Sequence, residues 1–160
     1  MNKSVKYIAI GGIIAAMYVV LTYVCSLMGL SSGVVQVRFS EALCILPCFM
    51  PAAIPGLFVG CLLSNLLTGC ALWDVVFGSL ATLIGACGTY LLRKNRFLAA
   101  VPPIMANTII VPFVLRLVYE VPDAMWLLFL TVFIGEFISI GILGELLYSV
   151  IKKYGRRLWE

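Results

Sequence analysis

The stretch VRFSEALCILPCFMPAAIPGLFVGCLLSNLLTG, residues 37–69, decides the fold. Most of it belongs to a block without charged residues, 42–73. A helix needs about 20 apolar residues to cross the hydrocarbon core of a bilayer, so this block is too long for one straight span and too short for two full ones. Proline breaks or kinks the interior of a helix, and three prolines interrupt the block: Pro47, Pro51 and Pro55.

Two interpretations compete for this block, and the basic residues elsewhere in the chain decide between them. The block is either one long kinked span or a hairpin of two short helices, 41–50 and 52–68. The hairpin places nine of the eleven lysines and arginines on one side of the membrane, and the exceptions are Arg38 and Arg116. The positive-inside rule expects such an excess at the cytoplasmic face. A single span would instead place the basic turn at Arg93 on the outer side of the membrane, against that rule. We therefore predict the hairpin, with both termini cytoplasmic.

The composition also indicates a membrane protein. Of the 160 residues, 63% are hydrophobic and 11% are charged, whereas soluble domains are about half apolar and about a quarter charged. A soluble fold of this length could not hide so much apolar surface, because small folds leave much of their area exposed. Disorder is excluded as well, since it requires low hydrophobicity and high net charge.

These patterns predict an all-α, polytopic membrane protein with a single domain over residues 1–160. Lysines precede the first apolar run, which is too long for a removable signal peptide, so we expect it to be retained as a helix. The outer loops are predicted at 29–40, 69–73 and 120–123. The six predicted transmembrane helices are 7–28, 41–50, 52–68, 74–92, 97–119 and 124–151.

Several classes of function are excluded by what the sequence lacks. Without histidine, the chain has no His-based metal site, Ser-His-Asp triad or histidine proton relay. The six cysteines show no CxxC pairing and lie in or beside apolar runs, so we expect neither a disulfide framework nor a metal site. No phosphate-binding loop and no hydrolase motif occurs. We therefore predict no enzyme and no cofactor in this chain, and basic residues clustered at one membrane face do not suit nucleic-acid binding.

Glu136 is the sharpest polar signal inside a predicted span. It lies about twelve residues below the outer end of the last helix, roughly 18 Å at 1.5 Å per residue. A carboxylate at that depth is costly unless it faces a wet cavity or a partner. Asn107 shares its depth on the neighbouring helix, and Ser139 lies one turn below on the same face. The group either binds a heterocycle, whose N–H groups a carboxylate accepts, or only ties the helices together.

A second polar set lies nearer the outer face. Arg38 and Glu41 are three residues apart and so share one side of the short second helix. Asn65 lies at the outer end of the third helix, and Asp74 opens the fourth. We consider these four as ligand-binding candidates. The alternatives are that Arg38 snorkels at a helix end and that Asp74, like Ser40, caps a helix.

Other polar and aromatic residues have simpler explanations. Glu145 lies near the cytoplasmic end of the last helix, where a nearby basic partner or another subunit would account for it, so we keep it out of the ligand site. Four aromatic residues suit the interface belt, and one or two of them would instead stack on a planar ligand: Tyr23, Trp73, Tyr119 and Trp126.

The first helix carries two pairs of small residues four apart, Gly11 with Ala15 and Gly12 with Ala16. Small residues at this spacing let another helix approach closely. The pairs either pack against a helix of the same chain or form a docking face for a partner protein.

The quoted stretch and the following DVVFGSLATLIGA, residues 74–86, resemble the QueT family. The likeness extends to the short, proline-bounded second helix, to Asn107 and to the run of Gly135, Glu136 and Ser139. QueT proteins are substrate-binding S components of energy-coupling-factor (ECF) transporters, linked to salvage of queuosine precursors. The resemblance implies an S-component bundle of six helices, with a ligand cavity in its outer half and loops one, three and five as lids.

The resemblance also implies partners and a location. It implies a membrane coupling subunit, docked on the small-residue face of the first helix, and two ATPase subunits that use ATP. The expected setting is the bacterial plasma membrane, which the chain crosses several times.

The residues fit the substrate that the resemblance implies. Queuosine precursors are deazaguanines, such as queuine or preQ1, and the nucleoside queuosine belongs to the same series. The guanine-like edge offers two adjacent N–H donors for Glu136, and Asn107 would serve the neighbouring carbonyl. Either Glu41 or Asp74 would hold a cationic aminomethyl or cyclopentenyl-amine group.

Three alternatives stay open. The chain could be an S component for another small heterocyclic vitamin, or a proton-coupled exporter in which Glu136 titrates. A membrane-embedded enzyme is the third, which the missing catalytic motifs disfavour.

Overall fold

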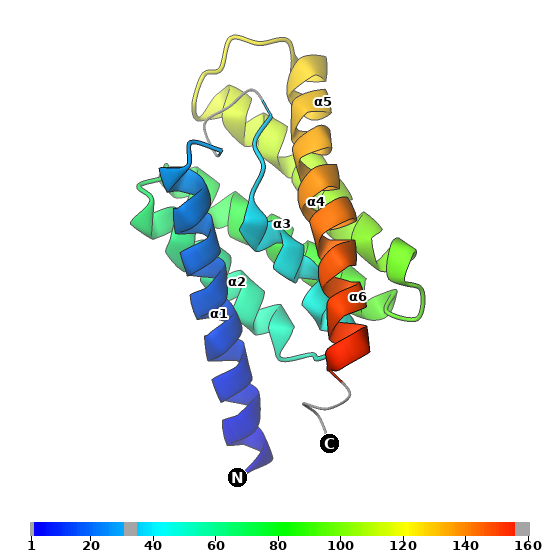
Figure 1. Cartoon of the computed structure of the whole chain (residues 1–160). Helices are drawn as coiled ribbons and strands as arrows, with labels where there is room; N and C mark the ends of the chain where they lie inside the picture. The colour runs from blue at the N-terminus through cyan, green and yellow to red at the C-terminus, as the bar shows by residue number, and fades with distance from the viewer. Residues whose placement is uncertain (1, 31–34, 156–160) are drawn as a thin grey trace.

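The computed structural model describes residues 2–30 and 35–155, and all the regular secondary structure in these ranges is helical, which confirms the predicted all-α class (Figure 1). Residues 31–34 of the predicted first loop, and Arg156 and Arg157 of the predicted tail, lie outside the described residues. Six helical rods form the described part of the chain: α1 (Lys3–Leu27), the 3-10 helix η1 (Phe39–Cys48), α2 (Ala53–Leu67), α3 (Leu72–Leu91), α4 (Arg96–Leu117), and a last rod of α5 (Met125–Glu136), the π-helix η2 (Phe137–Gly144) and α6 (Glu145–Tyr154).

Four of these rods are long and apolar enough to cross a membrane. They are α1, α3, α4 and the last rod, Met125–Tyr154. The 15 residues of α2 reach about 22 Å, less than the roughly 30 Å of a hydrocarbon core. Length and composition thus support four of the six predicted spans, and crossing by the two short helices stays a prediction. The start of α1 and the end of α6 lie at the same end of the bundle (Figure 1); the cytoplasmic location of both termini stays a prediction.

The short helix η1 forms the centre of the bundle. Its residues 40–47 are all buried, and it packs against both α1 and the last rod. The sequence predicts a short helix here without its type, and the structure gives a 3-10 helix with Pro47 inside it. At about 2.0 Å per residue, its 10 residues reach about 20 Å. The tighter winding therefore lets a short segment run deep into the bundle from its start at Phe39.

The small residues of α1 divide between two faces. A Cβ added to Gly56 of α2 would lie 2.7 Å from the Gly11 carbonyl oxygen, and one added to Gly60 would lie 3.0 Å from Cα of Ala15. Gly11 and Ala15 therefore belong to the α1–α2 contact, where packing within the chain accounts for them. Gly12 and Ala16 are exposed, so the predicted docking face narrows to these two residues.

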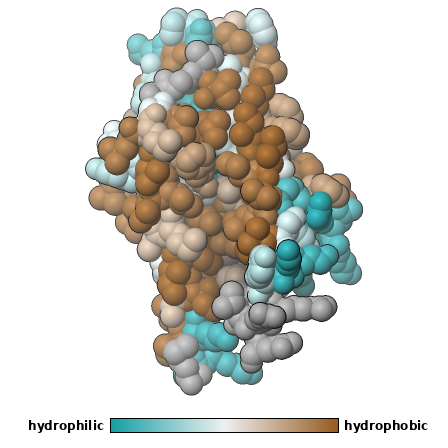
Figure 2. All heavy atoms as spheres, viewed as in Figure 1, coloured by the Kyte–Doolittle hydropathy of each residue, from teal (hydrophilic) through white to brown (hydrophobic). Residues whose placement is uncertain are grey.

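The surface fits a bilayer. Figure 2 shows a broad apolar region over the middle of the face in view, with hydrophilic residues gathered mainly toward the ends of the molecule. Large apolar side chains are exposed on every long helix, among them Leu27, Leu91 and Leu117. Such a surface is stable in lipid and would be an aggregation hazard in water.

Candidate ligand-binding site

Two joined cavities open at the end of the bundle opposite both termini, which we call the distal end. The larger cavity, the vestibule, has a volume of about 460 Å³. The smaller one, the pit, has about 20 Å³. Four residues line both cavities and so form the junction between them: Gln36, Arg38, Asp74 and Val111.

The predicted candidates meet in these cavities, except for one. Glu41, Asn107 and Glu136 line the pit. Asn65 lines the vestibule, where its side-chain amide donates to the Cys61 sulfur at 3.7 Å. Ser139 is buried but lines neither cavity.

Glu41 is held by donors from three elements. It is 2% exposed, and its Oε1 accepts a hydrogen bond from the Tyr18 hydroxyl of α1. Its Oε2 accepts from the Cys44 thiol at 3.2 Å and from Nδ2 of Asn107 at 3.4 Å. Hydrogen bonds to a carboxylate stabilise it in a buried setting. The protein itself therefore satisfies both oxygens of Glu41.

Glu136 lines the same pit, but unlike Glu41 it has a carboxylate oxygen without a hydrogen-bond donor. Its side chain is 8% exposed, and Oε2 has no hydrogen-bond partner among the described residues. A buried oxygen without a donor costs about 1–3 kcal/mol, and more when it is charged. Glu136 is the last residue of α5, directly before the π-helix η2, and π segments occur often at functional sites. The site thus contains an acceptor that the described part of the protein leaves unmatched.

Ser139 holds loop one instead of lining the site. Its hydroxyl donates to the Gly135 carbonyl at 2.8 Å and accepts from the Arg38 backbone N–H at 3.1 Å. The loop also fits closely against α5, because a Cβ on Gly135 would lie 2.2 Å from the Gln36 carbonyl oxygen. The predicted ligand contact of Ser139 has no support in this geometry. Its place in the structure is to seat residues 36–38 over the pit.

Asp74 is paired with a tyrosine at the mouth of the site. The Tyr119 hydroxyl donates to Asp74 Oδ2 at 3.0 Å and accepts from the Ala71 backbone N–H, also at 3.0 Å. Desolvation of this partly exposed side chain, with a smaller contribution from the Asp74 carboxylate, raises the pKa of Tyr119 to about 12, so the phenol stays a donor at neutral pH. Helix α3 has Ala71 at its N-cap and no side-chain cap. The capping alternative for Asp74 is therefore wrong.

Three further residues have structural partners. Ser40 accepts a hydrogen bond from Thr22 at 2.8 Å and does not cap η1. The Arg116 guanidinium donates to the Val121 carbonyl at 2.9 Å, so it braces the turn after α4 and lines neither cavity. Glu145 has the nearby basic partner that the sequence analysis considered, since its Oε2 lies 3.2 Å from Arg96 Nε.

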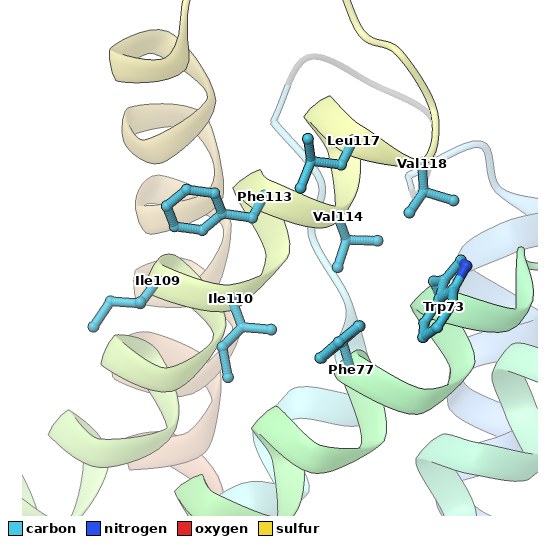
Figure 3. Close-up of a pocket in the computed structure, with 8 residues that line it drawn as sticks. All are labelled: Trp73, Phe77, Ile109, Ile110, Phe113, Val114, Leu117 and Val118. Atoms are coloured by element: carbon cyan, nitrogen blue, oxygen red, sulfur yellow. The ribbon is translucent and has the colours of Figure 1, made fainter.

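A third cavity suits the ligand poorly. Figure 3 shows this groove between α3 and α4, with a volume of about 510 Å³. The ring of Trp73 stacks on Phe77 there, with centroids 5.9 Å apart. All eight lining residues are apolar or aromatic, and none is charged. A heterocycle with several hydrogen-bonding groups needs convergent polar partners, which the vestibule and pit provide.

Sequence reasoning missed several residues of the site. Tyr18 stands in an uninterrupted apolar run, and nothing in that run marks its hydroxyl as a partner of Glu41. Gln36 carried a usable signal, because it is an uncharged polar residue close to Arg38 in an outer loop. Pit and vestibule walls also include residues whose small side chains gave no signal: Thr22, Ser26, Cys61, Gly78 and Thr82.

Comparison with known proteins adds two findings. The model of a family described as QueT transporter matches residues 8–153. A curated relative, the "Queuosine precursor transporter QueT" of Lactococcus lactis subsp. cremoris (strain MG1363), is 40% identical over 86 residues. That alignment covers 52% of this chain and 50% of the relative, so it spans about half the length of that protein. No solved structure matches the chain.

Proposed function

Because the chain belongs to the QueT transporter family, we propose that it is the substrate-binding S component of an ECF importer for queuosine precursors. The family is one of transporters and not of enzymes. The proposed substrates are deazaguanine bases such as queuine or preQ1, or the nucleoside queuosine. They would bind in the vestibule with one edge directed into the pit.

One observation carries this proposal: in the wall of the pit, the buried carboxylate of Glu136 has one oxygen without a donor and no cation within 4 Å among the described residues. The edge of a deazaguanine presents two adjacent N–H groups, and a carboxylate accepts both. Asn107 donates to Glu41 and lies within hydrogen-bonding reach of Glu136, so it would serve the neighbouring carbonyl of the ring by giving up one of these partners. The vestibule volume of about 460 Å³ lies in the range of small-molecule sites.

The size of the pit adds a requirement. A volume of about 20 Å³ holds about one water molecule, and neither Glu136 nor Asn107 lines the vestibule. A ring in the vestibule therefore reaches Glu136 only if side chains at the junction move aside. Gln36 and Arg38 are the candidates, because loop one carries them.

A titration series tests the substrate assignment. The purified chain is titrated with queuine, preQ1, queuosine and common heterocyclic vitamins by isothermal calorimetry. Binding of at least one deazaguanine, and of no vitamin, is expected. Binding of a vitamin alone would replace the assignment with an S component of another specificity.

The partners of the chain are part of the same proposal. A coupling subunit would dock on the exposed Gly12 and Ala16 of α1, and two ATPase subunits would supply the energy, since no nucleotide-binding motif occurs in this chain. Uptake into vesicles should therefore require the other subunits and ATP. Accumulation by the chain alone, driven by a proton gradient, would favour a proton-coupled transporter.

Matched substitutions on α1 test the docking face. Gly12→Leu should abolish transport and leave ligand binding intact, because a Cβ on Gly12 meets nothing within 4 Å in the chain. Gly11→Leu is the contrasting variant. It should damage ligand binding and transport together, since Gly11 packs against α2. Equal loss of binding in both variants would argue against docking at Gly12.

A further inference from the structure

Acidic side chains outnumber basic ones in the walls of the two cavities, unlike in the chain as a whole. Among the described residues that line them, the charged side chains are three carboxylates, Glu41, Asp74 and Glu136, and one guanidinium, Arg38. Three acids against one base in these walls contrast with the whole chain, whose formal charge is +4. Unbalanced charge inside a membrane protein is costly. The sign of the excess favours a cationic ligand and disfavours phosphorylated ones.

Arg38 does not cancel this excess by direct pairing. Its guanidinium lies in the wall of both cavities. The single ion pair within 4 Å among the described residues joins Arg96 and Glu145, at the other end of the last rod. No cavity carboxylate is therefore within ion-pair distance of Arg38.

The three carboxylates differ in how many of their oxygens remain free to accept a hydrogen bond from a ligand. Both oxygens of Glu41 already accept hydrogen bonds from Tyr18, Cys44 and Asn107. Glu136 lies in the pit, where the proposed function uses it for the ring edge. Asp74 lies at the junction, and only its Oδ2 accepts a hydrogen bond from the described part of the chain, the one from Tyr119. Its Oδ1 is free to accept another.

The shape of the ligand matches this arrangement. In an aminomethyl deazaguanine, the substituent projects from the five-membered ring, on the side away from the two N–H groups of the guanine-like edge. A base whose edge enters the pit at Glu136 would therefore direct its substituent back toward the junction and the vestibule. Asp74 lines both.

We propose that Asp74, held in place by the Tyr119 hydroxyl, binds the protonated amine substituent of the ligand, so that the site selects amine-bearing deazaguanines over neutral ones. This assignment rests on the proposed function and resolves the choice between Glu41 and Asp74 that the sequence leaves open. Glu41 becomes a positioning residue for Asn107 in the pit.

The test compares two probes on the full chain: preQ1, which carries the aminomethyl group, and 7-deazaguanine, the same ring without it. The wild type should bind preQ1 at least about tenfold more tightly. Asp74→Asn should remove most of that preference by weakening preQ1 binding, while 7-deazaguanine binding changes less than about threefold. Retained binding of 7-deazaguanine also reports that the variant is folded.

Two more variants keep the test decisive. Tyr119→Phe keeps the ring and removes the hydroxyl that holds Asp74, so it should reduce the preference for preQ1 partially. Asp123→Asn removes an exposed carboxylate outside both cavities and should leave the preference unchanged.

The outcomes separate this inference from the proposed function. Equal wild-type affinity for the two probes, or equal weakening of both by Asp74→Asn, would overturn the role of Asp74 and leave the proposed function standing. Failure of the wild type to bind either probe, and also queuine and queuosine, would overturn both.

Discussion

Two carboxylates flank the π-helix η2 on the last rod, and the molecule treats them differently. Glu145 begins α6 and has a cation at 3.2 Å, the Arg96 guanidinium at the start of α4, although neither of its oxygens meets a hydrogen-bond donor among the described residues. Glu136 ends α5 and lines the pit; one of its oxygens also lacks a donor, and no cation lies within 4 Å of its carboxylate among the described residues. A buried charge that the chain neutralises has a structural explanation. A buried charge that the chain leaves unmatched calls for a partner from outside, and this difference assigns the two residues to different roles.

The largest effect is expected for Glu136→Gln. The substitution keeps the shape but turns an acceptor oxygen into an NH₂ group that faces the donors of the ligand. A hydrogen bond to a charged group contributes about 1.5–3 kcal/mol, so the affinity for a deazaguanine should fall at least about tenfold. Calorimetric titration measures it. An affinity close to that of the wild type would mean that Glu136 only ties helices together, because glutamine can still bridge them.

A smaller effect is expected at Glu41, which lies in the same pit as Glu136 but has protein donors. Tyr18→Phe removes one of the three and leaves Cys44 and Asn107 in place. The free energy of unfolding should fall by about 1 kcal/mol, measured by thermal or denaturant unfolding in detergent. A loss of ligand affinity as large as that of Glu136→Gln would show that Glu41 contacts the ligand directly.

The smallest effect is expected for Glu145→Gln. Arg96 is 40% exposed in its pair with Glu145, and partly exposed ion pairs contribute about 0–1 kcal/mol. Stability should change within that range, and ligand affinity should stay within about twofold of the wild type. A double-mutant cycle with Arg96→Met isolates the pair. If Glu145→Gln weakened ligand binding as much as Glu136→Gln is expected to, the assignment of the two carboxylates to different roles would be wrong.

Much of the site could be predicted because charge inside a membrane segment is rare and costly. That rule points to Glu136. Glu41 and Asp74 were expected because they open predicted helices near the outer face, and the structure places all three in the walls of joined cavities. Ser139 shows where the rule stops. Its expected position, one turn below Glu136, assumes α-helical spacing, whereas Ser139 lies inside the π-helix η2 and bonds to loop one.

Tertiary partners were the other part beyond reach of the sequence. Tyr119 suits an interface belt by position, yet its hydroxyl lies on Asp74, far away along the chain. The prolines predicted a break between two short helices, but they do not encode the 3-10 winding of η1. That winding follows from packing at the centre of the bundle, where a short segment must cover a long distance.

The contact between Gly135 and Gln36 bears on how long a ligand stays bound. Loop one seats beside Glu136 only because residue 135 has no side chain, since a methyl group there would lie 2.2 Å from the Gln36 carbonyl oxygen. A molecule that enters the pit must pass the junction that this loop helps to form. Differences between related complexes arise mostly in the dissociation rate. The missing side chain at position 135 therefore bears on the residence time of the cargo, the interval during which a loaded subunit can find its energised partners.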